Sequence, residues 1–104
     1  VRSSAASDVY KRQGCIKLRT INIGNSVISI GEDAFRGCEN LKEVKLGNNI
    51  KYIGPQAFFN CSKIENIVLP DSITYIGDSA FEYLYSDYEI GTIPTQGKAS
   101  SLIQ

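Results

Sequence analysis

The sequence predicts an α/β repeat solenoid of three 23-residue coils plus a partial fourth. We expect each coil to supply one strand, a short second extended segment and a helical turn. Two observations lead there: Cys15, Cys38 and Cys61 recur at a constant spacing, and the segments that begin at them align without insertions. Repeats of this length are typical of solenoids, because one coil cannot bury its apolar side chains alone and neighbours must stack.

Eight columns of the alignment keep their apolar character in all three copies. Besides the cysteines, the columns are Leu18, Leu41 and Ile64; Ile21, Val44 and Ile67; Ile23, Leu46 and Leu69; Val27, Ile50 and Ile73; Ile30, Ile53 and Ile76; Ala34, Ala57 and Ala80; and Phe35, Phe58 and Phe81. A glycine follows the Ile30 column in each copy. These columns predict one core that runs continuously from coil to coil.

The spacing inside a coil predicts its elements in order. Val44 and Leu46 alternate with polar neighbours, which is the pattern of a half-buried strand. Turn residues follow at 47–49, and then comes the second extended segment. Pro55 favours the start of a helical turn, since the first amide of a helix has no partner to lose.

The position after that helical turn calls for a left-handed residue. Gly37 and Asn60 occupy it in the first two copies, and both adopt this conformation at low cost. Tyr83 departs from the rule in the third copy.

The first residues have a different character. The stretch "SSAASDVYKRQ" at 3–13 is similar to the translation of an adapter used in transposase-based preparation of sequencing libraries. We therefore expect residues 1–13 to be a disordered artefact joined to a metagenomic fragment, the alternative being a disordered natural terminus. Such segments are set aside before fold reasoning.

The other end of the repeat is ambiguous. We expect the solenoid fragment to cover 14–94, with a fourth strand placed either by keeping the 23-residue spacing or by one inserted residue that aligns Ile93-Pro94 with Leu69-Pro70. Residues 95–104 then form a C-terminal tail or a truncated coil.

The repeated pattern resembles a known family. Leu41-x-x-Val44-x-Leu46, followed by Ile53-Gly54, Ala57-Phe58 and Cys61, is similar to LxxIxIPxxVxxIGxxAFxxC, the signature of BspA-like leucine-rich repeats. The resemblance covers 15–83 and extends to 94 if a fourth strand is present. Gly24 and Gly47 replace the usual proline, and Tyr83-Leu84 replaces the closing pair. The resemblance implies a right-handed leucine-rich-repeat solenoid in which each coil supplies one strand of a parallel concave sheet. It also implies location on a cell surface, bacterial or protist, with a role in adhesion.

Catalysis and metal binding find little support. The chain has no histidine, which is the commonest base for a cysteine nucleophile and a common zinc ligand. A buried cysteine ladder is favoured, and a disulfide between adjacent coils stays open as an alternative. Solvation and capping account for the carboxylates of Glu32, Asp33, Asp71 and Asp78. We expect no enzyme, no catalytic residue, no metal and no cofactor.

The solvent-facing columns are the candidates for partner binding. On the predicted sheet they are Thr20, Glu43 and Asn66 and, two positions on, Asn22, Lys45 and Val68; Tyr52 and Tyr75 form a further column. Tyrosine is enriched at interfaces. The alternatives are a merely solvated face and cross-coil packing of the two tyrosines.

The functional hypothesis is a non-catalytic protein-interaction module of a cell-surface protein, which binds a protein or glycan on another cell or matrix. The alternatives are a spacer or accessory module beside a catalytic domain outside this fragment, and an intracellular scaffold. Residues 14–104 carry 8 Lys and Arg and 10 Asp and Glu, a balance that does not indicate a nucleic-acid partner. No apolar run approaches the roughly 20 residues of a membrane span, and membrane association is left undecided.

Overall fold

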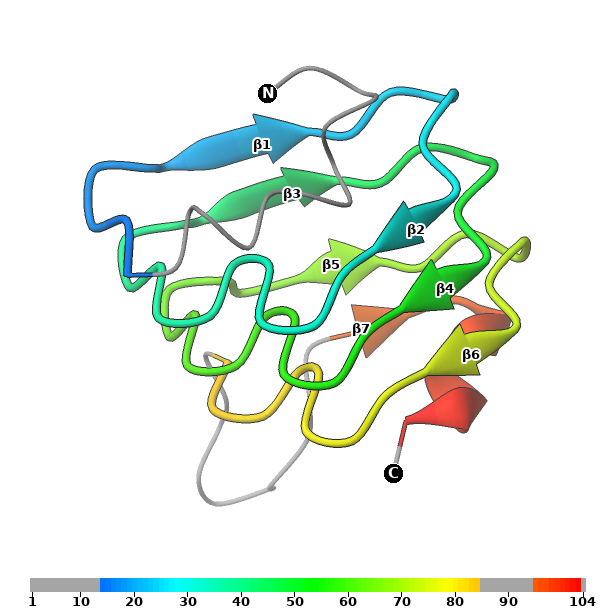
Figure 1. Ribbon diagram of the computed structural model, residues 1–104. Helices are drawn as coiled ribbons and strands as arrows, with labels where there is room; N and C mark the ends of the chain where they lie inside the picture. Colours follow the sequence, from blue (N-terminus) through cyan, green and yellow to red (C-terminus); the bar gives the residue numbers. More distant parts are fainter. Residues whose placement is uncertain (1–13, 85–94, 104) are drawn as a thin grey trace.

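The chain winds repeatedly between two layers of short parallel strands. The structure is a computed structural model that describes residues 14–84 and 95–103, so the expectation for residues 1–13 lies outside the described part. Strands β1, β3, β5 and β7 lie in one layer and β2, β4 and β6 in the other (Figure 1). The elements are β1 (Thr20–Asn22), β2 (Ser29–Ile30), β3 (Glu43–Lys45), β4 (Tyr52–Ile53), β5 (Ile67–Val68), β6 (Tyr75–Ile76), β7 (Thr95–Gln96) and the 3-10 helix η2 (Lys98–Leu102).

Strand pairing confirms parallel strands that are offset by one repeat. Thr20 pairs with Glu43 between β1 and β3, and Tyr52 pairs with Tyr75 between β4 and β6. The second extended segments form the three-stranded sheet β2-β4-β6. The coil count, the handedness and the concavity of the first layer stay predictions.

The layer of odd-numbered strands is interrupted between β3 and β5. We expected one continuous sheet here, but the described residues form two separate pairs, β1-β3 and β5-β7. Lys42 N–H donates to the Arg19 carbonyl across the first pair, whereas no equivalent bond joins Glu65 to Lys42 within residues 14–84. The coils stay together because the core and the β2-β4-β6 sheet continue past this point.

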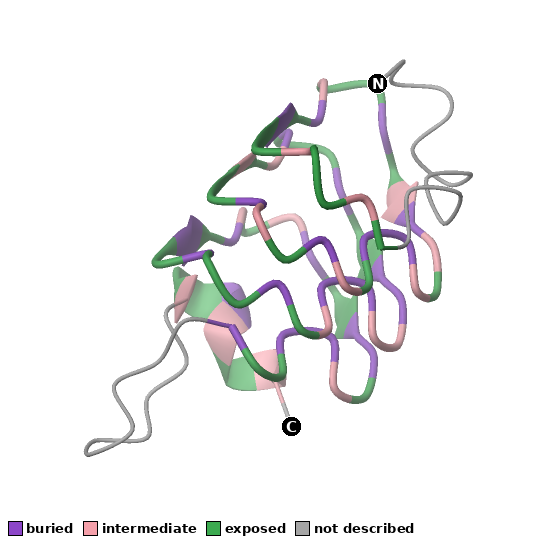
Figure 2. Ribbon diagram, turned by 90° about the vertical axis from the view of Figure 1, so that its left-hand side faces the viewer, coloured by how far each residue is buried: buried purple, intermediate pink, exposed green. Residues whose placement is uncertain are grey.

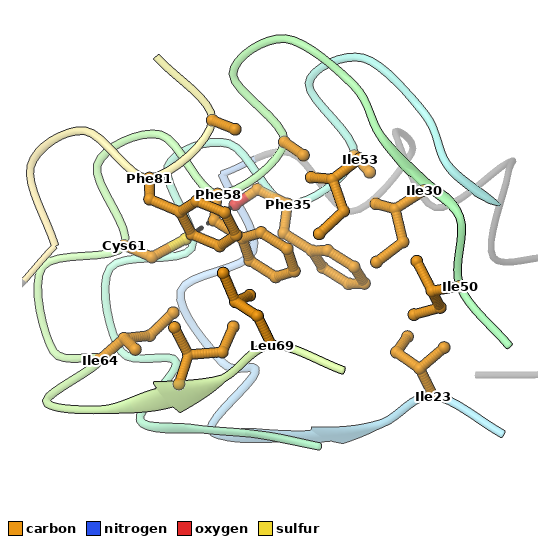
Figure 3. Packing of buried hydrophobic residues seen from close by; sticks show 14 of the residues in the cluster. Ile23, Ile30, Phe35, Ile50, Ile53, Phe58, Cys61, Ile64, Leu69 and Phe81 are labelled. Carbon is orange, nitrogen blue, oxygen red and sulfur yellow. Dashed lines mark hydrogen bonds between the residues drawn. The ribbon is translucent and has the colours of Figure 1, made fainter. Parts of the chain in front are cut away.

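Every coil carries buried residues that alternate along the chain with exposed and partly buried ones (Figure 2). The buried hydrophobic side chains form one cluster that includes residues of all the coils. The rings of Phe35, Phe58 and Phe81 stack with centroids 5.3 and 5.5 Å apart and planes within 15° and 6° of parallel (Figure 3). The predicted columns are buried with four exceptions that are only partly buried: Cys15 and Leu18 in the first coil, and Val44 and Leu46 beside the interruption of the sheet.

The predicted helical turn is wrong, because a left-handed residue interrupts it in every copy. Asp33, Gln56 and Ser79 have φ of 60°, 57° and 59°. Ala57 N–H donates to the Gly54 carbonyl, and its counterparts in the other copies do the same, so each segment opens with a β-turn. Positive φ at the third position and proline at the second are typical of a type II turn, which explains Pro55 better than a helix start does.

The predicted left-handed residue at the end of this segment is confirmed. Gly37 and Asn60 have φ of 74° and 61°. Tyr83 takes the same conformation with φ of 62°, although a left-handed backbone costs an L-residue about 1–2 kcal/mol. The repeat therefore imposes the backbone shape even where the residue type opposes it.

Neighbouring coils approach each other closely at the glycines that follow β4 and β6. A Cβ built on Gly54 would lie 2.6 Å from the backbone nitrogen of Glu32, and one on Gly77 would lie 2.3 Å from that of Pro55. Next to this contact, Phe35 N–H donates to the Ala57 carbonyl and Phe58 N–H to the Ala80 carbonyl, at 2.7 and 2.8 Å. Only glycine allows the two backbones to come this near.

The last strand is not where either alignment placed it. Thr95 of β7 pairs with Ile67 of β5, so the offset between these two strands is longer than both alignments assumed. The strand and helix η2, with buried Ala99, thus fall in the segment expected to be a tail or truncated coil. The added length lies between β6 and β7, and the alignment missed it because Ile90 and Ile93 offered apolar matches at shorter offsets.

A methyl group at Gly77 tests the close approach of the coils. Gly77→Ala should lower the free energy of unfolding by about 1–3 kcal/mol, since the added atom meets the backbone of Pro55. Urea unfolding followed by circular dichroism measures the change, with the exposed Lys51→Ala as the control. Equal stability of both variants would show that the coils do not need this contact.

Relief of the left-handed strain tests the turn assignment. Gln56→Gly should raise the free energy of unfolding by about 0.5–1 kcal/mol, because glycine adopts positive φ without a steric penalty. Ser62→Gly is the matched control at an exposed turn residue without positive φ, and it should lower stability. A loss of the same size in both variants would contradict the assignment.

Candidate functional site

An open groove of about 600 Å³ lies over the outer side chains of β1, β3 and the segment around β5. It is lined by six of the eight predicted partner-binding residues: Thr20, Asn22, Glu43, Lys45, Asn66 and Val68. The structure therefore brings together side chains from three successive repeats, which are far apart along the chain.

Strand alternation puts these side chains on the outer face. Ile21 is buried between exposed Thr20 and Asn22. The pairing of β1 with β3 then sets Thr20 beside Glu43 and Asn22 beside Lys45. Adjacent strands are about 4.8 Å apart, so each coil adds one row of exposed side chains to the groove.

A second groove of about 620 Å³ continues the first toward the residues that precede the strands. Both grooves are lined by Thr20, Lys42, Glu43 and Glu65, and the second adds Arg19, Asn40, Ser62 and Lys63. Sequence reasoning missed these added residues together with Lys42 and Glu65. The available signal was the column Arg19, Lys42 and Glu65, which is polar in all three copies and directly precedes the first strand residue.

The cations of the second groove have no ion-pair partner among the described residues. Arg19, Lys42 and Lys63 lie at its rim, and the salt bridge found within 14–84 and 95–103 joins Arg36 to Asp33, at 3.8 Å, in a different segment of the coil. That segment also carries other carboxylates, such as Glu32. The second groove is therefore lined by three cations and two carboxylates, Glu43 and Glu65, with no ion pair between them.

The two predicted tyrosines form a separate surface. Tyr52 and Tyr75 lie on β4 and β6, in the other strand layer, and their rings stack at 4.9 Å with planes 9° apart. They are 40% and 45% exposed. Packing between neighbouring coils is therefore enough to explain why both positions are tyrosine. The structure does not bring these tyrosines together with the groove residues.

The cysteines have the surroundings of core residues. All three thiols are free, Cys38 and Cys61 are buried, and Cys15 is partly buried. The Cys61 thiol donates to the Phe35 carbonyl at 3.1 Å (Figure 3). Burial, helped by the nearby Cys38, raises the pKa of Cys61 to about 12. A thiol that stays protonated in this way is a poor nucleophile.

The remaining chemistry of the described residues is limited. Glu32, Asp71 and Asp78 are exposed, as expected for solvated turn residues. Residues 14–84 and 95–103 contain no group of three His, Cys, Asp or Glu side chains that could hold a metal ion. Over the same ranges, no helix has the length and apolar character to cross a membrane.

The comparison with protein families identifies this architecture. Residues 7–98 match the BspA type leucine rich repeat region. The chain belongs to the BspA-type leucine-rich repeat family. This assigns the parallel strands and the repeated apolar columns to a leucine-rich-repeat fold, in a family of repeat proteins rather than an enzyme family.

Solved structures of bacterial leucine-rich repeat proteins are similar to the chain. One from Bacteroides capillosus has 33% identity and a TM-score of 0.62 over 75% of this chain, and one from Eubacterium ventriosum has 32% and 0.67 over 72%. A leucine-rich repeat protein from T. pallidum has 26% identity and a TM-score of 0.56 over 68% of this chain. The matches cover 54%, 20% and 44% of those proteins, respectively. A search of the curated proteins found no match.

The buried thiol predicts a dependence of stability on alkaline pH. The raised pKa means that the folded state favours the neutral Cys61 thiol, so this stabilisation is complete below pH 9 and is lost as the pH rises from 9.0 toward about 12. Urea unfolding at pH 8 and pH 11 should therefore show a smaller loss of stability in Cys61→Ala than in the unchanged protein. All other side chains are the same in both proteins, so identical losses would rule out this effect of Cys61.

Proposed function

We propose that this chain is a non-catalytic protein-interaction module of a cell-surface leucine-rich repeat protein, with a role in adhesion. Its binding surface is the groove over β1, β3 and the segment around β5, and its partner is a protein or a glycan on another cell or matrix. The observation that carries the proposal is that side chains from three repeats line one open groove without an ion pair between them.

The composition of the groove supports binding rather than chemistry. It offers amide, carboxylate, ammonium and hydroxyl groups beside the 56% exposed Val68, a mixture suited to a polar partner with some apolar contact. Membership of a repeat family supports the same view, because stacked repeats create extended binding surfaces. The cell-surface location rests on the resemblance to BspA-like proteins.

An exchange of charges across the groove tests the proposal. The double variant Glu43→Lys/Lys45→Glu exchanges two exposed side chains of the groove. It keeps the net charge and the two side-chain types but reverses the order of positive and negative charge along β3. Binding to immobilised matrix proteins, a glycan array and intact neighbouring cells should weaken at least 10-fold, which corresponds to about 1.4 kcal/mol.

The matched control is Lys51→Glu/Asp78→Lys, an equal exchange at two exposed positions outside the grooves. It should change binding less than twofold. Binding that survives both exchanges, or a chain that binds no member of the three panels, would favour a spacer that only presents neighbouring domains.

A further inference from the structure

The interruption between β3 and β5 leaves main-chain groups at the groove without a cross-strand partner. In the first coil the Arg19 carbonyl accepts from Lys42 N–H, and Ile23 N–H donates to the Lys45 carbonyl. One coil later the corresponding groups are the Lys42 carbonyl and Leu46 N–H, and neither has such a bond within residues 14–84. Of these two residues, Lys42 lines the groove and Leu46 does not. Unpaired backbone groups are costly to bury, so this part of the groove suits a partner that carries amides.

Apolar atoms surround these groups. Val44 and Leu46 are only partly buried, although the equivalent side chains of the flanking coils are buried. Val68 is 56% exposed beside them. A polypeptide with small apolar side chains suits unpaired backbone groups beside exposed apolar atoms better than a fully polar sugar does.

The cations that line the second groove favour a partner with negative charge. Arg19, Lys42 and Lys63 line this groove from three coils and form no ion pair with a described carboxylate. A guanidinium and an ammonium both bind carboxylates well. The carboxylates of Glu43 and Glu65 line the same groove, so a uniform polyanion meets repulsion there, whereas spaced carboxylates can bind at the cations.

The spacing of the coils fixes the spacing of the acidic groups. Three adjacent strands span about 9.6 Å, and an extended peptide advances about 3.3 Å per residue, so a peptide that crosses the strands moves from the first coil to the third in about three residues. Arg19 and Lys42 hold equivalent positions in adjacent coils, and Lys63 lies two residues before Glu65, which holds that position in the third coil. Carboxylates at about this separation therefore lie near the cations of the first and third coils.

We propose that the groove recognises an extended acidic polypeptide segment, whose carboxylates bind at Arg19, Lys42 and Lys63 and whose backbone N–H donates to the unpaired Lys42 carbonyl, directly before β3. This rests on the proposed function and specifies the partner chemistry of the same site. The acidic segment belongs to the partner protein, and a sulfated glycan is the competing occupant that the test below discriminates.

The test uses the full chain and a labelled ten-residue peptide that contains Asp-Val-Val-Asp, with Asn-Val-Val-Asn as the uncharged twin and a heparin-derived hexasaccharide as the glycan probe. Fluorescence anisotropy at about 50 mM and 300 mM NaCl measures the dissociation constants. The acidic peptide should bind at least 10-fold more tightly than its twin and lose affinity at high salt, since screening weakens exposed charge pairs.

Variants locate the peptide. Arg19→Gln/Lys42→Gln/Lys63→Gln should weaken binding of the acidic peptide at least 10-fold, whereas the control Lys17→Gln/Lys51→Gln should change it less than twofold. All five side chains are exposed, and circular dichroism checks the fold of each variant. Equal affinity for the two peptides, tighter binding of the hexasaccharide, or no effect of the triple variant would overturn the proposal.

The two proposals fail in different ways. If the exchange Glu43→Lys/Lys45→Glu abolishes binding to a panel partner but the acidic peptide does not bind or compete, the groove is a binding site and its partner is not an acidic segment. The second outcome is that the chain binds neither any panel member nor the acidic peptide. That result would exclude the interaction module itself.

Discussion

Close contact between neighbouring coils holds every other feature of this structure in place. No coil encloses a core of its own, so the repeated columns that contain Ile30, Phe35 and Cys38 are buried where the coils stack on one another. The glycines at 54 and 77 let the backbones approach, and the stacked phenylalanine rings repeat at the same interval as the strands. The rows of exposed side chains inherit this interval, which means that the geometry of the groove follows from the packing of the core.

Much of the fold could be predicted because the same 23-residue pattern occurs three times in the sequence. Buried columns, parallel pairing and the left-handed positions at Gly37 and Asn60 follow from comparing copies. The helical turn was wrong because a segment such as "PQAFF" contains nothing that forbids a helix, and only the left-handed conformation of Gln56 does so. The interruption between β3 and β5 has no signal in single residues either, since both segments read as ordinary strands.

The candidate site was predictable in part for the same reason. The alternation of buried and exposed residues along a strand identified the six groove residues from the sequence. The residues that precede the strands were missed, because their column changes from Arg19 and Lys42 to Glu65 and shows no shared charge. The separation of Tyr52 and Tyr75 from the groove depends on which layer each extended segment joins. That is a property of three-dimensional winding rather than of local pattern.

The pairing of β5 with β7 across an offset longer than one repeat has an evolutionary consequence. The two strands pair although the chain between β6 and β7 is longer than the chain between β4 and β5, so the length of a connection can vary while the stacked rows keep their order. Unequal recombination that adds one unit preserves every column and supplies one new row of outward residues. A repeat protein of this kind can gain new binding specificity by duplication of a repeat and substitution of its outward residues, while the buried columns stay the same.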